Sequence, residues 1–277
     1  MRIEKILNNN AVVSNIDKEE VIVIGRGVAF EKRVGDEVNR QTIEKIFTLT
    51  NEGINKKFKS LITEIPIEYM ELTERIIDYA KMKLGKKLND SLYIHLTDHI
   101  HFAIARFNTD LGLKNGLLLE TKQLYTEEYE IGLEALNMIL DQFGVLLPED
   151  EAGFLALHIV NAEMNEEMNV VKQMTKVMQE ILTIIRYSLK SEISEDSLSY
   201  YRLITHLKFF AQRLVKGIHY NQDQSEDLLQ MIRDKYAKAY KCSEKIKKFV
   251  GVQYNYQLSD EEMLYLTVHI QRVANKK

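Results

Sequence analysis

The sequence predicts a multidomain α+β protein in which a small antiparallel β-sheet is followed by two homologous all-α helical bundles. Residues 1 to about 55 contain short β-branched runs between turn formers, whereas apolar residues recur three and four apart from about residue 60. The helical part also repeats itself at a nearly constant offset. The only two prolines, Pro66 before the first bundle and Pro148 at an expected helix start, agree with long uninterrupted helices.

The N-terminal part predicts a sheet of about four antiparallel strands. Turn residues such as Asn8 to Asn10 separate the extended runs. The strand candidates are residues 2–7, 11–15, 20–24, 28–32 and 43–49. Because so short a sheet buries little apolar surface, we expect another surface to cover one of its faces, most simply that of a second copy.

The helical part predicts two related bundles. In the first half, the spacing predicts helices over residues 69–83, 92–107, 127–143 and 150–164. His99 and His206 lie 107 positions apart, and the segment 147–159 matches 258–270 at an offset of 111. We therefore divide the chain into residues 1–57, 58–169 and 170–277.

Composition places few limits on function but excludes some classes. Charged residues make up 28% and hydrophobic residues 45%, which is typical of a folded soluble protein. Neither a membrane-spanning run nor a signal peptide is evident, so we expect a cytoplasmic protein with no membrane insertion. The net charge of -4 argues against non-specific coating of nucleic acid. The single cysteine, Cys242, is expected in the core.

Four of the seven histidines occupy two repeated positions: His99 and His158, then His206 and His269. They can be packing residues, metal ligands, nucleophiles or acceptors of a phosphoryl group. His95 and His99 are four apart but lack the glutamate of a zinc protease motif, and His206 has no partner four residues earlier. The sequence also lacks a nucleophile elbow and a phosphate-binding or dinucleotide loop. We therefore expect no enzyme, no metal site and no cofactor.

Phosphoryl acceptance requires an accessible neutral imidazole, and it adds a charge near -2. At an interface between subunits or bundles, that charge repels a carboxylate or recruits an arginine and so shifts a two-state equilibrium. Asp98 and Arg213 are candidates for these opposite roles, although both can equally be solvated residues of a helix face.

Taken together, these features resemble the BglG/SacY family of transcriptional antiterminators over essentially the whole chain. The matching residues are Lys5 to Asn10, Gly25 to Phe30 with Lys32, Gly35 and Asp36, and the four repeated histidines. The resemblance implies that residues 1–57 are a co-antiterminator RNA-binding domain. It further implies that residues 58–169 and 170–277 are two phosphotransferase-system (PTS) regulation domains.

The resemblance also implies a homodimer that binds an RNA hairpin in the leader of a sugar-utilisation transcript and prevents a terminator from forming. The sugar it favours is an aryl β-glucoside or β-glucan fragment rather than sucrose. The implied RNA contacts are Lys5, Asn8, Asn10, Gly25, Arg26 and Phe30. Taken alone, Asn8 to Asn10 is also what a plain turn looks like, and Phe30 can belong to the sheet core.

Regulation is implied through two phosphoryl donors. The EIIB domain of a sugar transporter modifies His99, and secondarily His158, and inactivates the protein. The phosphocarrier protein HPr modifies His206 and His269 and favours the active dimer. Two other classes stay open: a phosphotransfer carrier, which needs one exposed histidine rather than four, and a DNA-binding activator, which needs a helix-turn-helix in place of the N-terminal strands.

Overall fold

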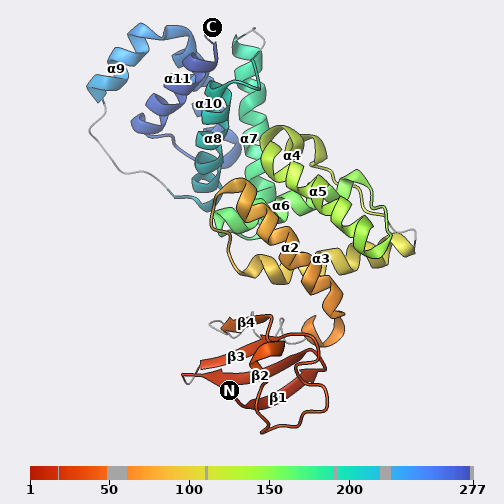
Figure 1. Cartoon of the computed structure of the whole chain (residues 1–277). Coiled ribbons are helices and arrows are strands. Elements are labelled where there is room, and N and C mark those ends of the chain that lie inside the picture. The colour runs from red at the N-terminus through yellow and green to blue at the C-terminus, as the bar shows by residue number, and fades with distance from the viewer. Residues whose placement is uncertain (18, 49–60, 110–111, 190–192, 219–225, 275–277) are drawn as a thin grey trace. The chain divides into compact units, whose positions relative to one another are not determined.

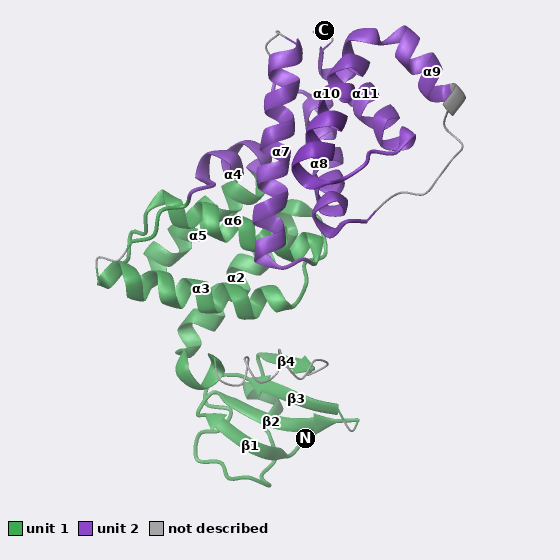
Figure 2. Ribbon diagram, turned by 180° about the vertical axis from the view of Figure 1, so that it is seen from behind, with its two compact units in different colours: residues 1–115, 127–165 green, residues 116–126, 166–277 purple. Residues whose placement is uncertain are grey.

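The computed structural model describes residues 1–17, 19–48, 61–109, 112–189, 193–218 and 226–274 (Figure 1). The chain forms two compact units (Figure 2). Unit 1 comprises Met1–Asn115 and Glu127–Asn165, and unit 2 comprises Gly116–Thr126 and Glu166–Lys277. Each unit is described separately below.

Unit 1 begins with the predicted sheet, which has four antiparallel strands in the order β1-β2-β3-β4. The strands are β1 (Ile3–Asn8), β2 (Ala11–Ile16), β3 (Glu19–Ile24) and β4 (Lys45–Thr48). The central pair is in continuous register, with Val12 opposite Val23 and Val13 opposite Ile22. A short 3₁₀ helix, η1 (Arg40–Thr42), precedes β4.

The strand predicted at residues 28–32 is wrong, because this segment is a series of turns. The amide of Val28 donates to the carbonyl of Gly25, and that of Phe30 donates to Gly27, both at 3.0 Å. Within the segment, Glu31 has a left-handed φ of 56°, which a strand cannot accommodate. The apolar residues Val28 and Ala29 are buried because the loop packs on the sheet.

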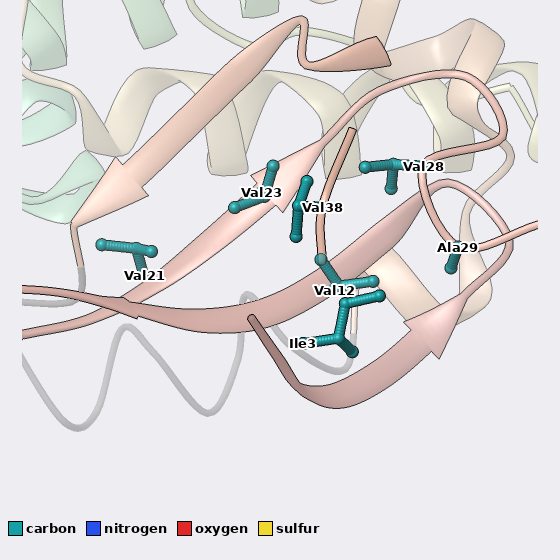
Figure 3. Close-up of a cluster of buried hydrophobic side chains, with 7 residues drawn as sticks. All are labelled: Ile3, Val12, Val21, Val23, Val28, Ala29 and Val38. Carbon is teal, nitrogen blue, oxygen red and sulfur yellow. The ribbon is translucent and has the colours of Figure 1, made fainter. Parts of the chain in front are cut away.

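One face of the sheet carries a core to which this loop contributes (Figure 3). The core cluster consists of Ile3, Val12, Val21, Val23, Val28, Ala29 and Val38. The sequence analysis expects another surface to cover one face of the sheet. Residues 28–38 of the same chain cover part of that face.

The four helices predicted for the first half are confirmed in unit 1. They are α2 (Ile67–Leu84), α3 (Ser91–Asn108), α5 (Thr126–Phe143) and α6 (Glu149–Met164). Helices α5 and α6 approach closely at Gly132, where a Cβ atom would lie 2.3 Å from the carbonyl oxygen of Ala152. A side chain at this position would separate the two helices.

Unit 2 repeats the succession of helices. It contains α4 (Leu118–Leu124), α7 (Met168–Leu189), α8 (Leu198–Lys216), α9 (Glu226–Lys235), α10 (Ala237–Tyr254) and α11 (Asp260–Ala274). By the two offsets, α8, α10 and α11 correspond to α3, α5 and α6. Both α5 and α10 are followed by a left-handed residue, Gly144 or Asn255. Cys242 is buried in the core as predicted.

Helix α4 was not predicted; it packs on α7. The hydroxyl of Tyr125 lies 3.1 Å from that of Thr175. None of the helices within the described ranges is long and apolar enough to cross a lipid bilayer.

Candidate functional site

The four repeated histidines form two pairs, one in each unit. In unit 1, the rings of His99 on α3 and His158 on α6 have centroids 4.9 Å apart. In unit 2, the rings of His206 on α8 and His269 on α11 are stacked with centroids 5.0 Å apart. All four residues are partly buried. The two repeated histidines of each half therefore lie next to each other within that half.

A buried glutamate and an arginine accompany the pair in unit 1. Glu151 Oε2 lies 2.8 Å from His99 Nε2, and Arg106 Nη2 donates to Glu151 Oε1 at 3.3 Å. The Glu151 side chain is only 3% exposed. Since an ionised carboxylate only accepts hydrogen bonds, this contact places a proton on His99 Nε2.

The same residue types recur in unit 2, but they are connected differently. Arg213 donates to Glu262 Oε1 from Nε at 3.3 Å and from Nη2 at 3.2 Å. Within the described part of the chain, His206 Nε2 is buried without a hydrogen-bond partner, and so is His269 Nδ1.

Burial governs the charge of the second pair. It lowers the pKa of His206 to about 4, with smaller contributions from His269 and Arg213. Burial also lowers the pKa of His269, assisted by Arg272 and Arg202. Both rings are therefore neutral near pH 7, which is the state that a phosphoryl acceptor needs.

The sequence analysis did not single out Glu151, which contacts His99, or the equivalent Glu262, which pairs with Arg213. The carboxylate at His99 is Glu151 from α6, not the neighbouring Asp98. Arg213 is correctly singled out as a cation near His206, and it already pairs with Glu262. Both glutamates lie in the motif repeated at offset 111, but nothing in that motif shows which helix they face.

Among the described residues, His101 lies outside these pairs. His101 packs edge-on against Tyr69, with ring centroids 5.0 Å apart. His219 lies outside the described residues. Among the residues that the structure describes, no group of three or more His, Cys, Asp or Glu side chains is arranged to hold a metal ion.

Three of the six candidate RNA contacts connect the turn between β1 and β2 with the loop that follows β3. Asn8 Oδ1 accepts from the amide of Asn10 at 2.7 Å, and Asn10 Oδ1 accepts from the amide of Gly27 at 2.8 Å. Asn8 also donates to the carbonyl of Ile62. At Gly25, a Cβ atom would lie 1.7 Å from the carbonyl oxygen of Thr42, so the loop can approach only because this residue is glycine. These residues shape the surface between the two loops.

The other three candidates are exposed. Phe30 is 62% exposed, and Lys5 lies exposed on β1. The guanidinium of Arg26 makes two hydrogen bonds of 2.8 Å to the carboxylate of Glu71 on α2. This pairing raises the pKa of Arg26. The cation proposed to meet RNA is therefore already matched by a carboxylate of the first bundle.

Comparisons with known proteins agree with this arrangement. The family model described as "CAT RNA binding domain" matches residues 1–56, and that described as "PRD domain" matches residues 74–162 and 179–273. The chain is 54% identical to the transcription antiterminator LicT of Bacillus subtilis (strain 168) over 277 residues, which is 100% of both proteins. It is 47% identical to the beta-glucoside operon antiterminator of Dickeya chrysanthemi over 278 residues, covering 100% of this chain and 98% of that protein.

A solved structure supports the same assignment for part of the chain. The crystal structure of GlcT CAT-PRDI aligns with a TM-score of 0.51 and 37% sequence identity. The alignment covers 59% of this chain and 98% of that one.

Proposed function

Since this chain belongs to the family of transcription antiterminators that join a CAT RNA-binding domain to two PRD domains, we propose that it is a sugar-controlled antiterminator. It is a cytoplasmic homodimer, and it regulates transcription without acting as an enzyme. It binds a hairpin in the leader of a β-glucoside utilisation transcript and thereby prevents a terminator from forming. The observation that carries the proposal is the full-length match to two antiterminators, one of a β-glucoside operon.

RNA binding is assigned to residues 1–57, and regulation to residues 58–169 and 170–277. The exposed Lys5, Arg26 and Phe30 supply charge and a ring that can stack on an unpaired base. Asn8, Asn10 and Gly25 hold in place the loop after β3, which presents Arg26 and Phe30. In a twofold dimer the small cluster occurs twice, which extends it along a hairpin.

Control is assigned to phosphorylation of the two histidine pairs. A neutral imidazole nitrogen attacks phosphorus, and the bond between phosphorus and the donor side chain breaks with its electron pair left on the donor. One proton passes from the acceptor ring to the donor, so charge and atoms balance. EIIB modifies His99 and secondarily His158, and HPr modifies His206 and His269.

The unit 1 pair explains why modification there disturbs the protein. A phosphoryl group on His99 brings a charge near -2 against the buried Glu151, whose carboxylate lies 2.8 Å from the ring. Arg106 pairs with the same carboxylate and is 26% exposed, so it can turn to the phosphoryl group. The Glu151 contact then breaks, and the packing of α3 against α6 changes with it.

RNA recognition is tested by titrating the full chain with a leader hairpin that has two internal loops and with duplex DNA of equal length. Tighter binding to the RNA is expected. Equal or tighter binding to the DNA would refute the RNA assignment.

Phosphorylation is tested by a phosphopeptide map after incubation with HPr, with and without the transporter EIIB domain. Phosphate is expected on His206 and His269 with HPr, and on His99 first with EIIB. His101, two residues after His99 on the same helix, serves as an internal control and should remain unmodified. If none of the four histidines is modified while sugar control persists, the assignment is wrong.

A further inference from the structure

The two histidine pairs differ in where the buried glutamate is held. In unit 1, Glu151 contacts His99 Nε2 at 2.8 Å. In unit 2, the equivalent residue Glu262 is equally buried, at 3% side-chain exposure, and is paired with the equivalent arginine. Among the described residues, however, His206 Nε2 has no hydrogen-bond partner. The cause lies in what else binds Glu262.

Two donors from the segment before α11 bind this carboxylate. The Tyr256 hydroxyl lies 3.0 Å from Glu262 Oε1 and also 3.0 Å from the carbonyl oxygen of Ile218, so both acceptors share its proton. Burial, followed by the charge of Glu262, raises the pKa of Tyr256 to about 12, which keeps it a donor. The amide of Ser259 donates to Glu262 Oε2 at 3.2 Å, and the amide of Glu262 donates to Ser259 Oγ at 3.2 Å. These reciprocal bonds form a capping box at the start of α11.

Unit 1 lacks both donors because of its residue types. At the offset of 111, Tyr256 corresponds to Val145, which has no hydroxyl, and Ser259 corresponds to Pro148, which has no amide hydrogen. No capping box can form around Glu151, and its Oε2 contacts the histidine instead. The different contacts of the two glutamates therefore follow from the residue types at two pairs of equivalent positions.

We propose that Tyr256 and Ser259 are positioning residues that hold Glu262 away from His206 and so leave the buried Nε2 free of a carboxylate partner and able to accept a phosphoryl group once the ring is exposed, whereas Glu151 occupies the equivalent nitrogen of His99. In unit 2, phosphorylation at Nε2 requires exposure of the ring but no release of a carboxylate. The unit 1 site must first release Glu151, or must accept at Nδ1. This inference rests on the proposed phosphorylation, and it gives two sites with the same residue types a different readiness to accept a phosphoryl group.

The test uses the full-length variants Tyr256→Phe and Tyr256→Phe/Ser259→Pro. The first keeps the buried ring and removes only the hydroxyl, and the second also removes the amide donor, as in unit 1. The charged and titratable groups that contact or act on His206 are His269 and Tyr265 from α11 and Arg213 from its own helix, and Glu262 occupies the α11 position from which Glu151 contacts His99 in unit 1. Once released, Glu262 is expected to contact His206 Nε2 and stabilise the imidazolium. The pKa of His206, measured by NMR titration, should rise from about 4 by at least one pH unit.

Tyr254→Phe is the matched control. This tyrosine lies two residues earlier and donates to Glu180, a different carboxylate. Removing its hydroxyl should leave the titration of His206 unchanged. Circular dichroism of all variants at pH 7 verifies that they are folded.

The second measurement is the initial rate of His206 phosphorylation by HPr. It should fall several-fold in the double variant and stay unchanged in Tyr254→Phe. An unchanged His206 titration in both test variants would overturn the inference, and so would a shifted titration with an unchanged phosphorylation rate. If wild-type His206 is not phosphorylated at all, the proposed function fails, whereas the titration still decides whether Tyr256 and Ser259 hold Glu262 back.

Discussion

Acidification should destabilise unit 2 through His206, and replacing this residue should remove that sensitivity. An unfolded chain protonates histidine near pH 6.5, whereas burial lowers the pKa of His206 in the folded protein to about 4. Above pH 6.5 the ring is neutral in both states and contributes no pH dependence. Below pH 6.5, His206 is protonated in the unfolded chain but stays neutral in the folded chain. The free energy of unfolding therefore falls as pH drops from 6.5 toward 4.

The magnitude follows from the interval between the two pKa values. At pH 5 the unfolded histidine is almost fully protonated, and the folded one is about one-tenth protonated. Each pH unit below the unfolded value costs about 1.4 kcal/mol, so moving from pH 7 to pH 5 should cost about 2 kcal/mol. His206→Gln keeps a polar side chain of similar length without the titration. Its loss of stability over this interval should be smaller than that of wild type by about 2 kcal/mol.

The assay is urea unfolding of both full-length proteins at pH 8, 7, 6 and 5, supported by NMR titration of the His206 ring. The difference between the two proteins should be constant from pH 8 to pH 7, which provides an internal control. His269 has a lowered pKa in wild type and is present in both proteins, so most of its own effect cancels. Equal acid sensitivity of the two proteins, or a His206 midpoint near pH 6.5, would refute the reasoning.

Three further predictions concern contacts in unit 1. Glu71→Gln should increase RNA affinity a few-fold at low salt, because Arg26 loses a bidentate partner; a gel-shift titration that shows no gain would contradict this. Gly25→Ala should destabilise the sheet by about 3 kcal/mol through the clash with Thr42, as seen by thermal unfolding, whereas Gly116→Ala, with open space around it, should not. Glu151→Gln should lower stability by about 1.5–3 kcal/mol and weaken inhibition by EIIB in a transcription assay, and unaltered inhibition would exclude Glu151 from the switch.

The helices and the repeat were predictable because apolar periodicity reports which face of a helix is buried. The boundaries of α2, α3, α5 and α6 differ from the predicted ones by at most two residues. Helix α4 was missed because its seven residues are too short to show a period. The strand at residues 28–32 was wrongly predicted because apolar residues such as Val28 and Ala29 can be buried equally well by a loop that packs on a sheet.

The histidine pairs were only partly predictable. Repetition identified His99, His158, His206 and His269. It did not show which residues the repeated glutamates, Glu151 and Glu262, contact. The capping box that binds Glu262 is visible in the sequence as Ser-Asp-Glu-Glu, and the proline in its place before Glu151 is visible too. Their effect on a histidine becomes evident only when α8 and α11 are known to pack together.

The segment containing α4 has a consequence for experiments that dissect this protein. The polypeptide crosses between its two units at three places, after Asn115, Thr126 and Asn165, so a single cut in the backbone does not separate them. A fragment ending at Asn165 would keep Tyr125, which is 1% exposed, but would lose Thr175 and the rest of α7 that cover it. Truncations that keep only the sheet and first bundle should therefore expose new apolar surface, and their oligomeric state should be interpreted with that exposure in mind.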